Sequence, residues 1–406
     1  MEIVNKGVCA PIGFSANGIH AGIRKNKSKL DLSLIVSQCK ANAFAMYTTN
    51  LVKGAPIYVT KNHLADGHAI AMICNSGNAN TCNADGIDIA NKTCEILAKS
   101  LNIDANDIII ASTGVIGQPL SIKPFEDNMD KLVMGLGNSE EHADRAYQGI
   151  MTTDTKKKEI AVKFELDGKV CHIGAMTKGS GMIHPQMATM LCFITTDVSI
   201  SSPMLKMALE DCVGDTFNMV SVDGDTSTND MVSIMANGLA LNNTIANNDD
   251  NYNIFLKALK FVLTNLAMQM AKDGEGATKL LICHTYKAKD KDCAKVVSKS
   301  VICSSLLKAA MFGSDANWGR VLCAIGYCKA DVDINKIDVS FSSKAGSILV
   351  CKNGAGVDFS EEKAKEILSL DEITIDICLN DGDKEAYAYG CDLTYDYVRI
   401  NGDYRS

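Results

Sequence analysis

A stretch near the middle of the chain, residues 178–197, joins two unlike kinds of backbone. It begins KGSGM, and its two glycines favour an exposed and sharply turned main chain. From Thr189 to Thr196 the same stretch is mostly apolar, which is typical of a buried strand. A threonine at the start of such a strand could act as a nucleophile at the floor of a pocket, or it could be an ordinary strand residue.

The composition is that of an ordinary globular protein. The 406 residues are enough for a large core and, on length alone, for two domains. Hydrophobic residues make up 47% and charged residues 22% of the chain, and no break in composition marks a domain boundary. The formal net charge of −8 gives no electrostatic support for a nucleic acid or an anionic membrane as a partner.

The sixteen cysteines are the unusual part of the composition. None occurs in a C-x-x-C motif, so neither a zinc ribbon nor a thioredoxin motif is present. Several, such as Cys74 and Cys192, lie within apolar runs and are expected to be reduced core residues, which predicts a reducing compartment. We find no signal-peptide pattern and no stretch of eighteen uncharged apolar residues, so we expect a cytoplasmic protein without a membrane span.

The hydrophobic periodicity predicts a mixture of strands and helices. Strands are expected in LDLSLIVS, AFAMYTTN, AIAMIC, DIIIAS and LLICHTY, with a hairpin that turns at Asp167-Gly168. Helices are expected at 85–102, 124–135, 140–149, 202–213, 251–272, 290–310, 318–328 and near 360–369.

Three loops carry residues that are candidates for a site. In STGVIG, Gly114 would let the backbone approach a ligand, although these residues taken alone favour a plain strand-to-helix turn. The loop after 218 offers Asp223, Asp225 and Asp230 as oxygen donors, but it lacks the calcium-loop pattern, so we predict no metal. Glu275, between two glycines, is either a positioned carboxylate or part of a solvated turn.

KGSGMI, a proline and MATML together resemble the self-cleavage segment of the ornithine acetyltransferases, the glutamate N-acetyltransferases of arginine biosynthesis. Further matching runs follow the family's order: TTNLVKGAP, STGVIG, 218–230, DGEGATK and the C-terminal CDLTYDYVRINGDYRS. The resemblance implies that the chain cuts itself between Ala188 and Thr189, giving chains 1–188 and 189–406. His184 and Gln186 stand where the family more often has Ala and Asn.

The resemblance, rather than the periodicity, implies the fold and the assembly. The implied fold is a four-layer αββα sandwich like that of the N-terminal-nucleophile hydrolases, with a smaller α/β region. The two self-cleaved chains are expected to pair as an α2β2 heterotetramer.

The resemblance also implies the chemistry, which is transfer of acetyl from N2-acetyl-L-ornithine to L-glutamate through acetyl-Thr189. The freed α-amine of Thr189, with a reference pKa of about 7.7–8.0, can serve as the base. Thr113 and Gly114 are the implied oxyanion hole. The implied substrate-binding residues are Thr153, Lys178, Thr189, Glu275, Asn401 and Ser406. Among them, Lys178 suits an α-carboxylate and Glu275 a cationic amine.

Two other functions remain as alternatives. An aminopeptidase or amidase on the same self-processing scaffold would pass the acyl group to water, and a binding protein would keep the fold without catalysis. The catalytic positions all hold the expected residue types, which ranks the binding protein last. No metal or cofactor is expected, and acetyl-CoA is a possible second donor, although the sequence has no CoA fingerprint.

Overall fold

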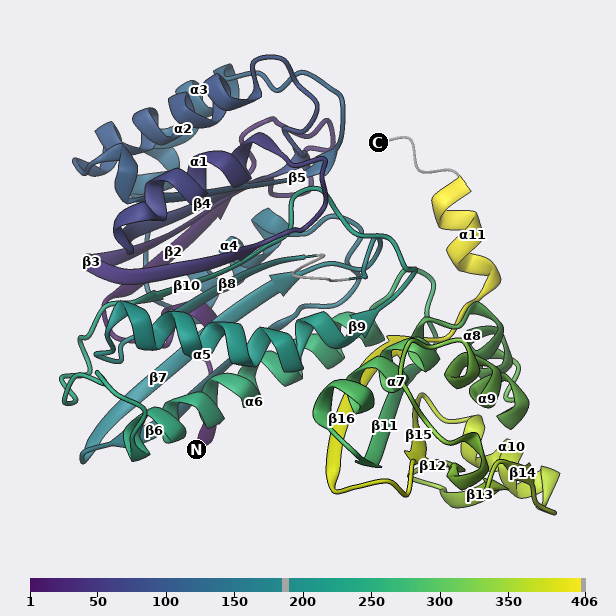
Figure 1. Cartoon of the computed structure of the whole chain (residues 1–406). Helices are drawn as coiled ribbons and strands as arrows, with labels where there is room; N and C mark the ends of the chain where they lie inside the picture. The colour runs from purple at the N-terminus through teal and green to yellow at the C-terminus, as the bar shows by residue number, and fades with distance from the viewer. Residues whose placement is uncertain (185–189, 403–406) are drawn as a thin grey trace.

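The computed structural model describes residues 1–184 and 190–402, which form a large layered region and a smaller region beside it (Figure 1). The strands of the large region are β1 (Glu2–Val4), β2 (Phe14–Ile19), β3 (Leu32–Tyr47), β4 (His68–Asn78), β5 (Ile108–Val115), β6 (Glu159–Leu166), β7 (Lys169–Lys178), β8 (Leu191–Thr196) and β10 (Met231–Ala236). Its helices are α1 (Ala55–His63), α2 (Gly86–Leu101), α3 (Lys123–Met134), α4 (Glu140–Ile150), α5 (Ser202–Asp215) and α6 (Asp250–Lys272).

The smaller region contains a second sheet and most of the remaining helices. Its strands are β9 (Val220–Ser221), β11 (Leu280–Ala288), β12 (Asp338–Ser343), β13 (Gly346–Lys352), β14 (Ala355–Gly356), β15 (Glu372–Cys378) and β16 (Lys384–Cys391). Its helices are α7 (Lys291–Cys303), α8 (Ser305–Phe312), α9 (Trp318–Gly326) and α10 (Glu361–Leu368), and α11 (Tyr395–Gly402) follows β16.

The long strand β3 joins two layers of the large sheet. Its residues 32–42 pair with β4, whereas residues 42–47 pair with β10. One layer therefore holds β2, β3, β4 and β5, and the other holds β10, β8, β7, β6 and β1. Side chains from both layers meet in one buried cluster, including Met72 of β4 and Phe193 of β8, so the two layers face each other across a shared core.

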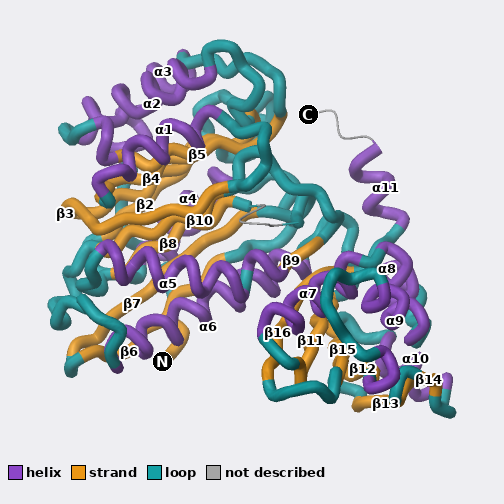
Figure 2. The backbone as a smooth tube through the Cα atoms, viewed as in Figure 1, coloured by secondary structure: helices purple, strands orange, loops and turns teal. Residues whose placement is uncertain are grey.

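Helices cover the outer faces of both layers, as Figure 2 shows in its arrangement of helices outside strands. Helices α1, α2 and α3 pack on the outer face of β4 and β5, where Ile73 and Ile110 are buried. Helices α5 and α6 pack on the opposite outer face, where Cys192 and Ile194 of β8 are buried. The order of layers is helix, strand, strand, helix, which is the αββα sandwich expected from the resemblance.

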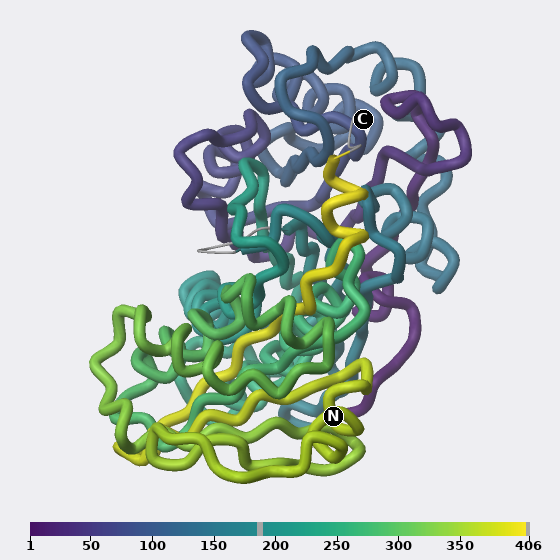
Figure 3. The backbone as a smooth tube through the Cα atoms, turned by 90° about the vertical axis from the view of Figure 1, so that its right-hand side faces the viewer, coloured from purple at the N-terminus to yellow at the C-terminus, as the bar shows by residue number. Residues whose placement is uncertain are grey.

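The smaller region is the expected α/β region. Its strand order is β14-β13-β12-β15-β11-β16-β9, and helices α7 to α10 pack against one apolar face of that sheet. Helix α6 contacts both regions, because its core cluster also contains Leu280 and Tyr389 from β11 and β16. After β16 the chain turns back, and α11 rises from the smaller region toward the large one (Figure 3).

Most predicted elements are present, with three differences. The segment 290–310 was expected as one helix, but α7 and α8 are separate because Ser304 is extended and its side chain caps α8 by accepting from the Leu307 N–H at 3.3 Å. The two runs expected as separate strands after Lys29 form the single strand β3. Helices α1 and α11 were not predicted.

Within the described residues, α6 is the helix long and apolar enough to cross a membrane by length and composition. Its apolar side chains, among them Phe255, Leu259 and Leu266, are buried in the core that α6 shares with the large sheet and the smaller region. A core helix of a folded domain has the same length, apolar composition and buried side chains.

The described residues on either side of the predicted cut lie side by side in one sheet. Strand β7 pairs antiparallel with β8, so that Lys178 lies opposite Leu191. Strand β8 pairs in turn with β10, and β10 pairs with β3. The proposed division into 1–188 and 189–406 stays a prediction, and it would fall within the large sheet rather than between the two regions.

Candidate active site

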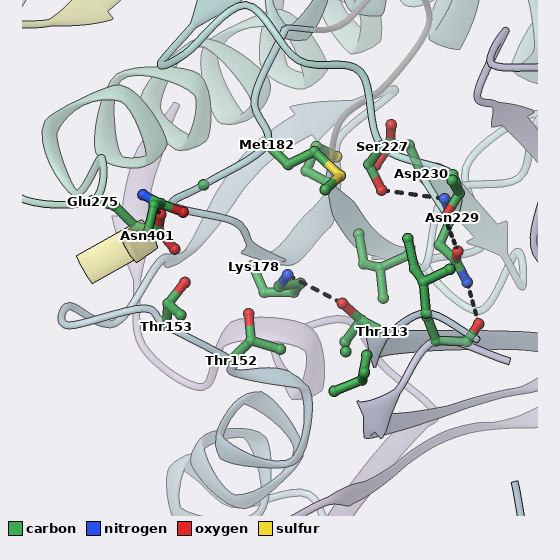
Figure 4. A pocket seen from close by; sticks show the side chains of 18 residues that line it. Thr113, Thr152, Thr153, Lys178, Met182, Ser227, Asn229, Asp230, Glu275 and Asn401 are labelled. Atoms are coloured by element: carbon green, nitrogen blue, oxygen red, sulfur yellow. Dashed lines mark hydrogen bonds between the residues drawn. The ribbon is translucent and has the colours of Figure 1, made fainter. Parts of the chain in front are cut away.

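A cavity of about 310 Å³ opens where β5 and β7 end and β8 begins (Figure 4). It is lined by Ala79, Thr113, Gly114, Val115, Ile116, Thr152, Thr153, Lys178, Gly181, Met182, Met190, Leu191, Ser227, Thr228, Asn229, Asp230, Glu275 and Asn401. Figure 4 shows Lys178 near the middle, with Glu275 and Asn401 on one side of it and Asn229 and Asp230 on the other. Elements from both regions and from the C-terminal helix therefore meet at one cavity.

Lys178 and Thr113 form the centre of this cavity. The Lys178 Nζ donates a hydrogen bond to the Thr113 Oγ1 at 3.2 Å, which leaves the threonine O–H proton available to another acceptor. Burial lowers the pKa of Lys178, and the negative charge of Asp154 opposes this shift by raising it. A lysine in this position is closer to losing its proton at neutral pH than an exposed lysine is.

Gly114 is required by its neighbours in the sheet. Its φ is +133°, and a Cβ at this position would lie 2.3 Å from the carbonyl carbon of Gly77 on β4. That this glycine also lets the backbone approach a ligand stays a prediction. The glycine still lines the cavity, with its main chain beside Thr113.

A buried network of charges supports the floor of the site. Asp154 accepts from the Lys158 Nζ at 2.6 Å and from the Gly179 N–H at 2.8 Å, and Lys158 also contacts Asp273 at 2.5 Å. Burial disfavours the ionised form of Asp154, but the charges of Lys158 and Lys178 outweigh it and hold the pKa of Asp154 below its usual range. The network ties the glycine-rich turn to the loop that follows α4 and to the end of α6.

The Glu275 carboxylate is held in place by a hydrogen bond, which is one of the two alternatives that the sequence left open for this residue. Its main-chain N–H donates to the Ser180 carbonyl at 2.9 Å, and the Asn401 Nδ2 donates to its Oε2 at 2.9 Å. A Cβ at Gly181 would lie 2.3 Å from that same oxygen, so a larger residue there would displace the carboxylate from its present position. Ser180 also bonds to Thr153 through their hydroxyls, at 2.8 Å.

The structure brings together every predicted site residue that it describes. These are Thr113, Gly114, Thr153, Lys178, Glu275 and Asn401, which all line the cavity. Ala188, Thr189 and Ser406 lie outside the described residues, as does Gln186. Met190, the residue bonded to Thr189, is described and lines the cavity as well.

The residues just before the predicted cut are held by the loop that precedes β10. The Asp223 carboxylate accepts from the main-chain N–H groups of Met182 and Ile183, at 2.6 and 2.9 Å. His184 lies outside the cavity, with its Nδ1 3.1 Å from the Ser221 Oγ, and burial lowers its pKa to about 4. Among the described residues no group of three or more metal-binding side chains comes together, and Asp223, Asp225 and Asp230 do not form one.

Sequence reasoning did not assign a role to Asn229 and Asp230, which form the wall opposite Glu275. The Asn229 side chain donates to the carbonyls of Ala79 and Ser112, at 2.5 and 3.0 Å, and so joins this loop to the ends of β4 and β5. Asp230 is 2% exposed. The signal in the sequence was the acidic loop itself, which we considered as a metal site and for which we predicted no metal.

Comparisons with known proteins identify the family of this chain. The ArgJ family model matches residues 15–406. Arginine biosynthesis bifunctional protein ArgJ 1 of Clostridium acetobutylicum is 47% identical over 403 residues, covering 99% of this chain and 98% of that protein. The ArgJ protein of Caldanaerobacter subterraneus is 44% identical over 407 residues, covering all of both chains.

A solved structure agrees as well. The crystal structure of the ArgJ protein of Bacillus halodurans is 45% identical and covers 53% of this chain and 100% of that chain, with a TM-score of 0.51. Because the family model spans nearly the whole sequence and full-length relatives match at 44–47% identity, this chain belongs to the ArgJ family, a family of arginine biosynthesis enzymes.

Proposed function

We propose that this enzyme transfers acetyl from N2-acetyl-L-ornithine to L-glutamate through an acetyl ester on Thr189. One observation carries the proposal: Lys178 and Thr113, from two strands, and Glu275, from the turn after α6, line one cavity together with Met190, the residue bonded to Thr189. The names of the relatives, which are arginine biosynthesis proteins, support the same pathway.

In the proposed mechanism Thr189 becomes a chain terminus by cleavage of the Ala188–Thr189 bond, and its α-amine then acts as the base. The Thr189 Oγ attacks the acetyl carbon, and the tetrahedral oxyanion accepts hydrogen bonds from the Thr113 hydroxyl and the Gly114 N–H. The Lys178–Thr113 hydrogen bond supports this role, because it directs the threonine proton away from the lysine. Ornithine leaves, and the glutamate amine takes the acetyl group.

The substrate contacts follow from charge. Lys178 has three N–H donors and uses one on Thr113, so the others suit the α-carboxylate of the amino acid. Glu275 suits the side-chain ammonium of ornithine, and Asn401 holds its carboxylate in place. Thr153 and Ser406 complete the proposed binding set. The reaction needs no metal or cofactor, because the nucleophile and the base belong to the chain.

The proposal extends to the form of the enzyme and to its donors. We infer two self-cleaved chains, an α2β2 assembly and a cytoplasmic location. The relatives are named bifunctional, and we take acetyl-CoA as the second donor, since the same acetyl ester would form from it. Incubation with each donor and glutamate, with N-acetylglutamate as the measured product, separates the two activities.

Substitution of Thr189 tests the nucleophile. Thr189→Ala removes the hydroxyl, so both self-cleavage and acetyl transfer should stop. Thr189→Ser keeps a hydroxyl, so part of both should survive, reduced because serine lacks the methyl that restricts χ1. With N-acetylornithine and no glutamate, intact mass should show one acetyl group on the fragment beginning at residue 189, labile to hydroxylamine because the bond is an ester.

Two results would contradict this mechanism. Acetyl on the fragment 1–188, or turnover by the Thr189→Ala variant, would remove Thr189 as the nucleophile. Release of acetate at the same rate with and without glutamate would favour the amidase alternative, in which water takes the acyl group.

A further inference from the structure

A second cavity, of about 430 Å³, lies apart from the candidate active site. It is lined by Asp215, Met219, Lys260, Thr264, Lys291, Lys295, Glu385, Ala386, Tyr387 and Tyr389. None of these residues lines the active-site cavity. Most of them belong to α5, α6, α7 and β16, so the second cavity opens where helices of the large region meet the smaller region (Figure 1). The proposed acetyl transfer gives it no role.

Three lysines surround one carboxylate in this second cavity. Asp215, the last residue of α5, accepts from the Lys260 Nζ and the Lys291 Nζ through Oδ2, at 2.7 Å each. The Lys295 Nζ lies 2.8 Å from its Oδ1. The Asp215 side chain is 12% exposed. Burial disfavours its ionised form, but the three lysines outweigh burial and hold the pKa of Asp215 below its usual range.

The charges that line the second cavity do not balance. Among the described residues they are the three lysines, Asp215 and Glu385. Glu385 is already paired, because its Oε2 lies 2.9 Å from the His284 Nε2. One carboxylate is therefore left to balance three ammonium groups. Each ammonium group has three N–H donors, so donors remain on each lysine after its contact with Asp215. In a chain of net charge −8, such a local excess of positive charge attracts anions.

We infer that the second cavity binds a small anion that carries phosphate groups, held by Lys260, Lys291 and Lys295. The kind of cation favours phosphate over carboxylate. An arginine fork matches the two oxygens of a planar carboxylate, whereas a lysine ammonium is a point charge that suits the oxygens of a tetrahedral phosphate. None of the described residues that line the cavity is an arginine. The inference does not depend on the proposed acetyl transfer, because the two cavities share no lining residue.

A purely structural role for the lysines makes a different prediction. Asp215 joins α5 to α6 through Lys260 and to α7 through Lys291 and Lys295. If these ion pairs served only to hold the helices together, loss of a lysine would change stability without affecting any anion. If the cavity binds an anion, that anion also bridges α6 and α7, so it should raise the Tm of the chain.

Titration of the full chain with inorganic pyrophosphate tests the inference. Isothermal titration calorimetry in metal-free buffer at fixed ionic strength should show one site. Lys291→Gln should raise the Kd at least about tenfold, and Lys260→Gln combined with Lys291→Gln on the order of 10²-fold, because each removes a charged contact. The Lys260 and Lys291 side chains are 50% and 52% exposed, so both variants should fold.

Two further variants separate the site from general charge effects. Lys257→Gln changes the net charge equally on the exposed face of α6 but outside the cavity, so it should bind pyrophosphate as the unmodified chain does. Lys291→Arg keeps the charge and should bind more tightly than Lys291→Gln. Citrate, whose negative charges are carboxylates, should bind more weakly than pyrophosphate to the unmodified chain.

Three results would overturn the inference. Pyrophosphate that gives no binding would remove the site. Equal affinity in Lys291→Gln and Lys257→Gln would show that the three lysines only hold helices together. Citrate that binds as tightly as pyrophosphate would overturn the assignment to a phosphate group. All three results would leave the acetyltransferase proposal standing, since its test is the acetyl group on Thr189.

Discussion

At the scale of single residues, the site depends on where two glycines and one lysine place their neighbours. Gly114 brings the ends of β4 and β5 together, and Gly181 makes room for the Glu275 carboxylate. Lys178 connects the Gly114 side of the site with the Gly181 side. Its Nζ donates to the Thr113 hydroxyl, and the charge of Asp154 attracts it. A change to any of these residues should therefore act on catalysis through geometry as well as through charge.

Thr113 should matter to the chemical step more than to binding. Thr113→Ala removes the hydroxyl proposed to stabilise the oxyanion, so kcat should fall by on the order of 10²-fold with little change in substrate affinity. Steady-state kinetics with N-acetylornithine and glutamate measures both constants. Thr113→Ser, which keeps the hydroxyl, is the control and should retain most of the activity. An unchanged kcat in Thr113→Ala would remove this residue from the mechanism.

At the scale of elements, α11 contributes to the site and little to the core. None of its described side chains is buried, and an eight-residue helix is too short to be stable alone. It is held by Asn401 on Glu275, by the preceding Thr394 hydroxyl on the Gly276 carbonyl at 2.6 Å, and by an edge contact of Tyr395 with Phe312. Its position over the cavity therefore depends on two hydrogen bonds and one aromatic contact.

Truncation after Thr394 tests the role of α11. Because none of the described side chains that are lost, those of residues 395–402, is buried, the Tm should stay within about 3 °C of the full chain. KM for N-acetylornithine should rise by roughly tenfold or more, since Glu275 loses its partner and one wall of the cavity is removed. Asn401→Ala removes only the bond to Glu275 and should raise KM by less. A KM equal to that of the full chain would show that α11 is not part of the substrate site.

At the scale of the whole molecule, the large sheet connects the two proposed chains. Strand β8 lies between β7 and β10, and β10 continues the ladder to β3. The cores on both sides of this sheet contain residues from before and after the predicted cut. Cleavage at Ala188–Thr189 would leave all of these contacts in place.

We therefore expect the two fragments to remain together. Size-exclusion chromatography in native buffer should give one peak that contains both, at the volume of the uncut Thr189→Ala variant. The fragments should separate only in denaturant, because hydrogen-bonded strands and buried apolar surface hold them. Two peaks in native buffer, each with one fragment, would show that the shared sheet does not hold the two fragments together.

The sequence by itself determined the local structure and much of the site. Helices such as α2 and α6 follow from spacing along one helical face, and the turn at Asp167-Gly168 follows from residues that accept positive φ, which here are 51° and 72°. The motif resemblance identified six described residues that line one cavity. Local backbone preferences depend on near neighbours in the chain, so they can be predicted without the rest of the molecule.

Only the tertiary structure decided which distant groups meet. Lys158 and Asp273 are 115 positions apart and pair in the interior, and Asn401 reaches Glu275 across 126 positions. Asp230 looked like one more acidic loop residue until its burial beside Met190 was known. The ionisation of a carboxyl group depends on desolvation and on nearby charges, and both are set by how remote segments pack, not by the residues next to it in the chain.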